Sequence, residues 1–532
     1  VCDRVLVWVA RHFYWKPFAQ ACKTPERAQL KLLRQILNRQ SITEFGKLHE
    51  FNKIDSYRAY QEAVPVQDYE SLRPWIERQA RSGKIEICAD QAEIYNQTSG
   101  STGAPKYIPM SGRSLATLKR SQVLAALMAR PACPEAFDGK ALCIASAAYE
   151  GQNDWGVAVG SASGLILQNM PQYARRNHLL PTVVATIADP DLRYDVIALH
   201  ALAESDLRFI ATANPSTLLQ LLNRIQRHWP EYRKNLTGQQ ILKGYETMTD
   251  QQKAVCDAVS ASAERLQYLD RLFDAESEPG YAGLWPELRL VVTWTGGSCG
   301  VPLGLIRHSL PRNCQVMELG YLASEMRGSI TLADGQRGVP AITENFYEFQ
   351  KVSDHETGVQ RFRMLHEVEQ GELYYVYVTN WNGLYRYQMN DIVRVQECFE
   401  MTPCLRFMQK GKGVTNITGE KLYESHVTEA LAHLREKLGI ETRFHVCLAD
   451  EVGACYRLYV EPGSSVTDHE LIANSLDRAL ADINCEYRSK RSSGRLGPIE
   501  VRLLREGTGT QFKAFHVSRG QREGQFLSLI HI

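Results

Sequence analysis

A short hydroxyl-rich segment between two β-prone stretches constrains the fold of this chain more than any other feature. Residues 93–97 and 106–109 favour strands, and the segment between them combines serines, threonines and glycines with a following lysine. The glycines allow the backbone to approach an anion closely, while the hydroxyl groups, the amides and the lysine can bind phosphate oxygens. The composition therefore predicts a phosphate-binding loop for a nucleoside triphosphate, formed by Thr98, Ser99, Gly100, Ser101, Thr102, Gly103 and Lys106.

This loop differs from the G-x-x-x-x-G-K-[ST] phosphate loop, because its glycine spacing is different and Tyr107 follows the lysine. A Ser/Gly-rich surface turn is the alternative that composition alone leaves open. The order Thr-Ser-Gly-Ser-Thr-Gly-x-Pro-Lys, which begins at Thr98, resembles the signature loop of the adenylate-forming superfamily. The resemblance implies an enzyme that joins a carboxylate to AMP and releases pyrophosphate.

The length and the charge of the chain set its broad class. A chain of 532 residues exceeds what one hydrophobic core usually supports, so we expect a large domain and a small one. The 61 basic and 60 acidic residues create no overall field, so we expect neither nucleic acid nor a membrane as a partner. The 13 cysteines lie singly, and no apolar run reaches the roughly 20 residues of a membrane span, which predicts a cytoplasmic protein.

Strand-like and helix-like segments alternate along the chain. Residues 207–213 and 288–294 are apolar, β-prone stretches, and residues 215–225 have helical periodicity. The alternation predicts an α/β fold, with a large N-terminal domain of mixed or parallel sheets flanked by helices. After the second strand, Gly297 and Ser298 could let a flat ligand approach the end of a sheet, although a plain strand-to-helix turn explains the same residues.

A second set of candidate residues follows a predicted strand at residues 315–319. Tyr321 can stack on a base, and Ser324 can donate to a phosphate. Glu325 can bind Mg²⁺, which prefers one or two carboxylates together with phosphate oxygens, although a solvated loop glutamate is the alternative. The segment resembles the Tyr-x-x-Ser-Glu signature of the auxin-responsive promoter (GH-three) family of acyl acid amido synthetases. This resemblance implies a metal-binding and catalytic role for Glu325.

A third signature lies within residues 384–394. It resembles the Arg-Tyr-x-x-Gly-Asp string of the same family, which implies that Asp391 binds the ribose hydroxyls of ATP. A strand-end aspartate that fixes a turn is the alternative. Asn390 stands where the family usually has glycine, but asparagine tolerates a positive φ, so the backbone can still match.

The segment from residue 405 to residue 424 predicts a hinge. Lys410 or Lys412 could contact a phosphate or ribose oxygen, and a solvated hairpin is equally consistent with the sequence. Relatives have a Gly-Arg-x-x-Asp-type hinge here, whose Arg and Asp this chain lacks, and we assign the catalytic lysine to Lys412. Helices at 425–438 and 468–483, with strands at 444–448, 456–460 and 499–504, then predict a small α+β C-terminal lid domain.

These signatures predict the domain boundaries. We expect a large adenylate-forming domain at residues 1–408, a hinge at 409–413 and a lid at 414–526. In the family, the closing phenylalanine that corresponds to Phe526 is usually followed by Lys-x-Pro, and that lysine reaches the acyl phosphate. Residues 527–532 lack this lysine, so we expect them to be a non-native tail.

The resemblance covers nearly the whole chain, with its signatures in the expected order. It implies an amido synthetase that uses ATP and Mg²⁺, adenylates a small carboxylic acid and transfers the acyl group to an amino acid or another amine, releasing AMP. An adenylate-forming ligase with a thiol acceptor such as coenzyme A and a catalytically silent nucleotide-binding relative are the alternatives. Residues 147–165 and 346–349 could line the acyl pocket, although core packing explains them equally well.

Overall fold

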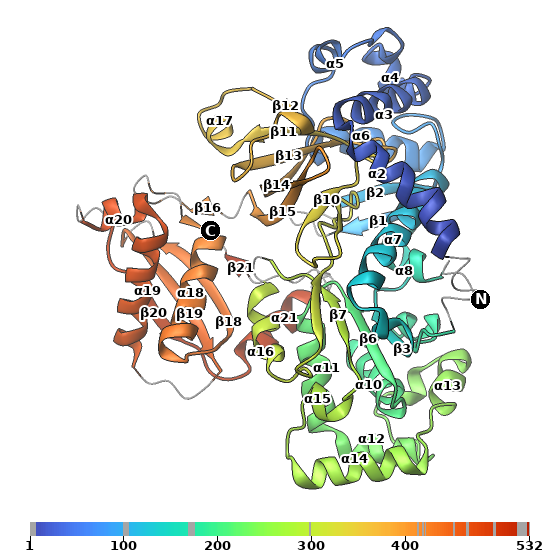
Figure 1. The fold of residues 1–532 in the computed structure, drawn as a ribbon, viewed down its shortest axis with the longest axis vertical. Coiled ribbons are helices and arrows are strands. Elements are labelled where there is room, and N and C mark those ends of the chain that lie inside the picture. The colour runs from blue at the N-terminus through green and yellow to red at the C-terminus, as the bar shows by residue number, and fades with distance from the viewer. Residues whose placement is uncertain are drawn as a thin grey trace.

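The computed structural model shows an α/β protein in which several sheets are flanked by helices (Figure 1). It describes residues 7–98, 106–168, 176–296, 299–411, 414–415, 417, 420, 422–450, 453–463, 468–492, 496–518 and 529–530. None of the helices in these ranges combines the length and the apolarity that crossing a bilayer requires. The predicted fold class is confirmed.

The chain begins with helices that cover one sheet. Helix α3 (Pro25–Gln40) is amphipathic, and its leucine-rich stripe is buried against β11 (Phe346–Lys351). Helix α6 (Tyr69–Ser82) begins with a capping box between Asp68 and Ser71, and it ends at Gly83, whose φ is +67°. The remaining elements of this segment are η1 (Arg11–Trp15), α2 (Lys16–Cys22), α4 (Glu44–Leu48), η2 (Phe51–Lys53) and α5 (Tyr57–Ala63).

The predicted phosphate loop connects the two strands of a hairpin. Strand β1 (Ala92–Thr98) pairs antiparallel with β2 (Lys106–Ser111), and Thr98 lies opposite Lys106 at the open end. The sheet continues through β5 (Ala158–Gly160) to β4 (Gly151–Gln152), in the order β2-β1-β5-β4. Helices α7 (Gly112–Ala132) and α8 (Ala162–Gln168) contact each other, and α7 also contacts β2.

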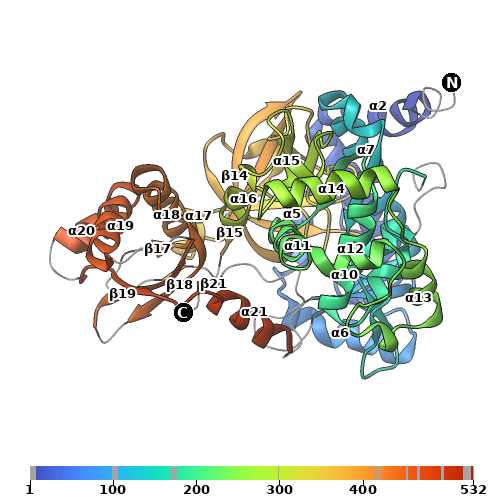
Figure 2. The ribbon, with the colours of Figure 1, turned by 90° about the horizontal axis from the view of Figure 1, so that it is seen from below.

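A parallel four-stranded sheet confirms the predicted alternation of strands and helices. Its strands follow one another in chain order: β3 (Lys140–Ile144), β6 (Leu207–Thr212), β7 (Leu290–Thr293) and β8 (Gln315–Glu318). Apolar side chains from the strands and from most of the helices of this region form one core. These helices, mostly green in Figure 2, lie together on one side of the molecule. The helices are η3 (Pro134–Phe137), η4 (Thr182–Thr186), α10 (Pro190–Ala203), α11 (Ser216–Arg227), α12 (Trp229–Leu236), η5 (Tyr245–Thr247), α13 (Asp250–Asp257), α14 (Ala263–Ala275), α15 (Tyr281–Leu284) and α16 (Gly300–Arg307).

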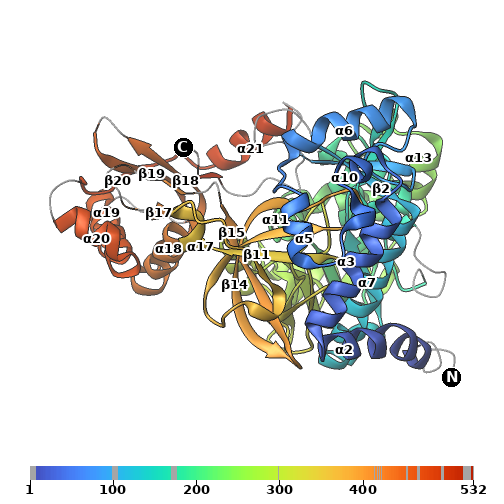
Figure 3. The same cartoon turned by 90° about the horizontal axis from the view of Figure 1, so that it is seen from above.

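The largest sheet has seven strands, and every pairing in it is antiparallel. The order is β12 (Arg363–Met364), β11, β13 (Leu373–Thr379), β14 (Tyr387–Phe399), β15 (Thr402–Lys410), β10 (Gly338–Pro340) and β9 (Ser329–Thr331). It lies between the N-terminal helices and the C-terminal part of the chain (Figure 3). The short helices α17 (Val352–Glu356) and η7 (Leu365–Glu367) pack beside it.

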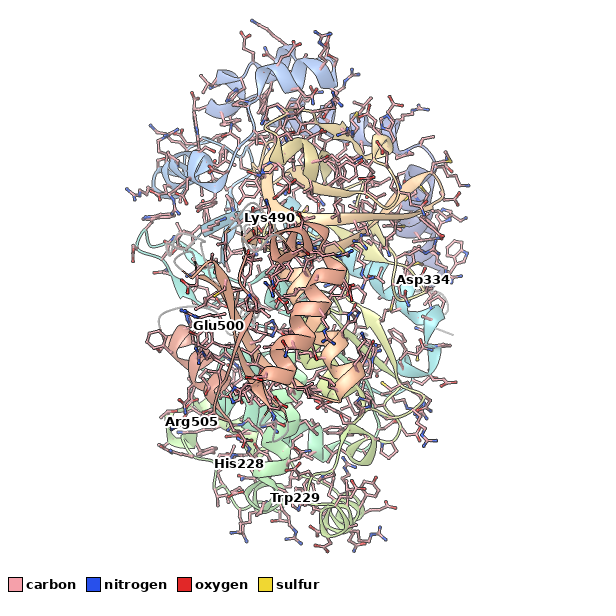
Figure 4. The ribbon with its side chains drawn as sticks, turned by 90° about the vertical axis from the view of Figure 1, so that its left-hand side faces the viewer. His228, Trp229, Asp334, Lys490, Glu500 and Arg505 are labelled. Carbon is pink, nitrogen blue, oxygen red and sulfur yellow. The ribbon has the colours of Figure 1, made fainter. Side chains whose placement is uncertain are left out.

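The C-terminal part has a core of its own. Its sheet has the order β20 (Glu500–Leu503), β19 (Cys455–Pro462), β18 (Thr442–Asp450) and β21 (Leu529–Ile530). Helices α18 (Glu424–Leu438) and α19 (His469–Ile483), which agree with the predicted helices, contribute to this core, and α20 (Cys485–Ser492) and α21 (Thr508–Ser518) complete the set. The pair β16 (Val414–Thr415) and β17 (Leu422–Tyr423) connects it to β15. Figure 4 views the molecule from this side, with Lys490 and Glu500 marking α20 and β20.

Candidate functional site

A cleft of about 3000 Å³ lies where the carboxyl ends of the parallel strands meet the end of the β1–β2 hairpin. Its wall includes the segments that follow β6, β7 and β8, which is where ligands bind in open α/β sheets. The start of β14, the end of β15 and the start of α18 also line the cleft. Several predicted residues line this one cleft: Lys106, Tyr321, Ser324, Glu325 and Asp391.

Asp391 is fully buried at the wall of the cleft, on β14. The Tyr321 hydroxyl donates to Asp391 Oδ2 at 2.5 Å, and the Lys410 ammonium group forms an ion pair with Asp391 Oδ1. Lys410 lies opposite Asp391 in the register of β14 and β15. Asn390 has a φ of +54°, the conformation that its residue type was expected to tolerate.

Tyr321 is a rigid partner for this carboxylate. Its side chain is buried and stacks on Phe407, with ring centroids 5.9 Å apart and an interplanar angle of 23°. Burial and the neighbouring Asp391 carboxylate raise the pKa of the Tyr321 hydroxyl well above its usual value. The phenol therefore stays protonated and keeps donating to Asp391.

Side-chain amides hold the backbone of the loop that carries Ser324 and Glu325. Asn96 Nδ2 on β1 donates to the Ser324 carbonyl at 2.9 Å, although the two residues are 228 positions apart. Asn380 and Asn382 both donate from Nδ2 to the Glu325 carbonyl at 3.1 Å. These contacts fix the loop so that Ser324 and Glu325 face the cleft.

The Glu325 carboxylate is half-buried and accepts a long hydrogen bond of 3.4 Å from the Tyr387 hydroxyl. Among the described residues, no cluster of three or more His, Cys, Asp or Glu side chains could hold a metal ion by itself. A single carboxylate in a polar cleft is nevertheless the donor set that Mg²⁺ uses when phosphate oxygens complete its shell.

Arg327 is a site residue that sequence reasoning missed. Its buried guanidinium donates to the Leu319 carbonyl at 2.9 Å and to the Ser329 carbonyl at 3.2 Å, so it closes the loop on both sides of Tyr321. Burial lowers the pKa of Arg327 to about 10. The sequence does show a charged residue just after the Glu325 segment. No neighbouring residue, however, indicates that the Arg327 side chain points into the protein.

The arginine of the third signature has a structural partner. Arg386 lies in the left-handed region, with a φ of +45°, and its Nε donates to both oxygens of the Glu348 carboxylate at 3.1 and 3.0 Å. Its Nη1 donates to the carbonyls of Gln61 and Val64. Both charged side chains are buried, so this pair joins the residue before β14 to β11 and to the C-terminal end of α5.

The hairpin that carries the predicted phosphate loop is attached to α6. The Tyr107 amide donates to the Tyr69 hydroxyl at 2.6 Å, and Lys106 Nζ lies 5.6 Å from the centre of the same ring. Thr98 and Lys106 are described at the end of the hairpin. The remaining predicted site residues lie outside the described part of the chain: Ser99, Gly100, Ser101, Thr102, Gly103, Gly297, Ser298 and Lys412.

The predicted acyl-pocket segments have different positions. Ala147, Ser161 and Gly164 from the first segment line the cleft, together with the apolar residues of η4. Phe346, Tyr347 and Phe349 from the second segment do not line it, so that prediction was wrong. Strand β11 is an inner strand of the seven-stranded sheet, and these rings are fully buried in its core.

Comparison with known proteins identifies the relatives of this chain. An indole-3-acetic acid-amido synthetase, GH3.8 from Oryza sativa subsp. indica, is 24% identical over 94% of this chain and 87% of its own length. The jasmonoyl-L-amino acid synthetase JAR6 from Nicotiana attenuata is 23% identical over 96% of this chain and 91% of its own length.

Solved structures have the same fold. The GH3.15 acyl acid amido synthetase in complex with 2,4-DB superposes with a TM-score of 0.84 at 20% identity, covering 98% of this chain and 94% of that chain. A 2-hydroxyisobutyryl-CoA ligase in complex with R3-HIB-AMP has a TM-score of 0.53 at 14% identity, covering 93% and 92%.

Three family domains match in order. They are the GH3 family N-terminal domain at residues 15–313, the central domain at 338–410 and the C-terminal domain at 423–526. The first and third signatures lie within the N-terminal and central domains, the Tyr-x-x-Ser-Glu signature at residues 321–325 lies between these two domains, and the matches confirm the resemblance. This chain belongs to the GH3 family.

Proposed function

We propose that this chain is an ATP-dependent acyl acid amido synthetase. The observation that carries the proposal is that Ser324, Glu325 and Asp391, from two separate signatures, line one cleft with the β1–β2 hairpin. Full-length relatives named as amido synthetases agree with the function expected from the sequence.

Each predicted residue has a proposed place around the nucleotide. Asp391 accepts from the ribose hydroxyls, and Lys106 and the loop of Thr98 to Gly103 bind the phosphates. Gly297 and Ser298 contact the base, and Ser324 donates to a phosphate. Tyr321, whose buried ring stacks on Phe407, does not stack on the base as expected but holds Asp391 beside the ribose. Glu325 would hold Mg²⁺, which when bound neutralises phosphate charge, and the half-buried Glu325 carboxylate fits this role.

The proposed reaction has two steps. In the first step a carboxylate oxygen of the acid attacks the α-phosphorus of ATP, the bond to the β-phosphate bridging oxygen breaks, and pyrophosphate leaves. The residues around the phosphates, including Lys412, contribute charge stabilisation, since such displacements need little covalent help. In the second step an amine nitrogen attacks the acyl carbon, loses a proton and displaces AMP.

We propose that residues 414–526 act as a lid on a large domain of residues 1–408, with a hinge at 409–413. Three observations support this division. The C-terminal part has its own core, β15 ends at Lys410, and the matched family domains are separated between residues 410 and 423. The Ser425 amide donates to Gln409 Oε1 at 3.2 Å, so the first turn of α18 contacts the proposed hinge. Residues 527–532 remain a proposed non-native tail.

The proposed substrates are a small carboxylic acid and an amino acid or another amine. Apolar side chains of η4 and small side chains of α7 line the cleft beyond Ser324 and suit an apolar acid. Within the described residues, free thiols such as those of Cys22, Cys88 and Cys404, all buried, are compatible with the proposed cytoplasmic location.

The test is pyrophosphate exchange into ATP with a panel of carboxylic acids. We expect exchange that depends on one class of acid, followed by amide formation with an amino acid. Product formation with coenzyme A instead of an amine would assign the chain to the thiol-using ligases. An enzyme that binds ATP but shows no exchange with any acid would be the silent nucleotide-binding relative.

A further inference from the structure

Lys410 contacts the proposed ribose site and lines the same cleft as the proposed metal site. It is the last residue of β15, its ammonium group contacts Asp391, and its side chain lines the same cleft as Glu325 and Ser324. Desolvation lowers the pKa of Lys410, but the carboxylates of Asp391 and Glu325 outweigh that effect and raise the pKa above its ordinary value. The group is therefore a cation at any pH at which the enzyme works.

The two partners of Asp391 differ in their freedom to move. The Asp391 side chain is 1% exposed, because Tyr321 contacts one oxygen and Lys410 covers the other. Tyr321 is buried against Phe407 and cannot leave without opening the core. The Lys410 side chain is 51% exposed and ends a strand, so it can rotate away into the cleft.

A ribose diol that binds Asp391 has to reach a carboxylate that Lys410 covers. Displacing Lys410 frees one oxygen of Asp391 for the diol, and it releases a cation inside a cleft whose wall also carries Glu325 and Ser324. A lysine ammonium group separated from one anion is stabilised by the next anion within reach. The nearest anion that the nucleotide itself brings to this place is its α-phosphate.

We propose that Lys410 exchanges partners: it covers Asp391 in the nucleotide-free enzyme, and it binds the α-phosphate once the ribose has displaced it. This inference rests on the proposed function, since it presupposes a nucleotide whose ribose binds Asp391. It assigns to Lys410 a direct contact with the phosphate at which the acid reacts. Because Lys410 belongs to the proposed hinge, nucleotide binding also changes the contacts of that segment.

The experiment compares a nucleoside with nucleotides. Binding of adenosine, AMP and ATP is measured by calorimetry for the wild-type chain and for Lys410→Met, Lys410→Gln and Lys410→Arg. For Lys410→Met we expect adenosine to bind at least as tightly as to the wild type, since the cover of Asp391 is gone. We expect AMP to bind roughly ten-fold or more weakly, because a hydrogen bond to a charged group is lost.

The other variants separate charge from coverage. Lys410→Gln can still donate to Asp391 but has no charge, so it loses AMP affinity without a gain for adenosine. Lys410→Arg keeps the charge, and we expect its AMP affinity to stay within about three-fold of the wild type. Lys53→Met, on the exposed surface beside Glu50, is the charge-matched control and leaves all three affinities unchanged.

Two results would overturn the inference. One is an equal change in adenosine and AMP affinity in Lys410→Met, which would mean that Lys410 acts only on Asp391. The other is an unchanged AMP affinity in that variant. Failure of the proposed function looks different, because the wild-type chain itself would then give no acid-dependent exchange, whatever its affinity for AMP and ATP.

Discussion

Two buried carboxylates of the seven-stranded sheet each pair with a cation, and the two pairs behave differently. Glu348 pairs with Arg386, and Asp391 pairs with Lys410, and each carboxylate side chain is 1% exposed. The difference lies in the cations, because Arg386 is 4% exposed and Lys410 is 51% exposed. A pair in which both side chains are buried holds elements of the fold together. In a pair whose cation is exposed, a ligand can displace the cation and reach the carboxylate.

A third buried carboxylate sharpens the comparison. Glu344 is 2% exposed, and within the described residues it makes a hydrogen bond with the Ser121 hydroxyl and no ion pair. Burial raises the pKa of Glu344 to about 7, against an ordinary value of 4.5, although Arg120 and Arg327 act in the opposite direction. Without a directly bonded cation, this carboxyl group responds to burial by holding its proton.

The largest effect is expected from breaking the buried ion pair of Glu348 and Arg386. Arg386→Met should reduce the free energy of unfolding by about 3–5 kcal/mol, because the buried Glu348 charge then has no cation and keeps only the Tyr57 hydroxyl as a donor. Lys410→Met should cost about 1 kcal/mol or less, because water can reach Asp391 once the lysine is shortened. Chemical denaturation of both variants measures the difference, and equal losses would contradict the distinction.

Enzymatic activity should depend on Asp391, whose partner cation is exposed, and on Glu325 in the same cleft. Glu325→Ala should slow acyl-adenylate formation by roughly 100-fold or more with a smaller change in the KM for ATP, because phosphate charge matters most in the transition state. Asp391→Ala should raise the KM for ATP by roughly ten-fold or more. Initial-rate kinetics of pyrophosphate exchange separate the two parameters. Small and equal effects of both changes would mean that the site is misplaced.

The unpaired carboxyl group predicts a dependence of stability on pH. A carboxyl group whose pKa is raised in the folded state binds more protons folded than unfolded between pH 4.5 and 7, so its contribution to stability falls as the pH rises through that range. Glu344→Gln should remove this contribution and stabilise the protein by about 1–3 kcal/mol above pH 7. Thermal unfolding of the variant and the wild type at pH 5 and pH 8 tests this, and an equal difference at the two pH values would refute it.

The smallest effect is expected from changing Tyr321, the buried partner of Asp391. Tyr321→Phe removes one hydrogen bond and should raise the KM for ATP by roughly five-fold, which corresponds to about 1 kcal/mol, with little change in kcat. Tyr281→Phe is the matched control, because it also removes a buried hydroxyl, which donates to the Leu218 carbonyl in the parallel-sheet core. The control should lose stability and leave the KM unchanged.

Local sequence determined the elements and their residue types. The periodicity of α11, α18 and α19 and the β-prone runs of β6, β7 and β8 were sufficient to predict them, because each element buries one face or stripe. Asn390 was expected to accept a positive φ, and it has one. The signatures likewise identified Ser324, Glu325 and Asp391, which the structure brings to one cleft.

Tertiary structure alone decided which side chains meet. Asn96 and Ser324, or Arg386 and Glu348, are joined only when separate strands come together, since a side-chain direction in a strand depends on register and on what covers each face. For the same reason Phe346 and Phe349 are core residues of an inner strand and not pocket residues. Whether a cation beside a carboxylate is buried or exposed depends on the neighbouring elements. For this reason only the fold distinguishes Arg386 from Lys410.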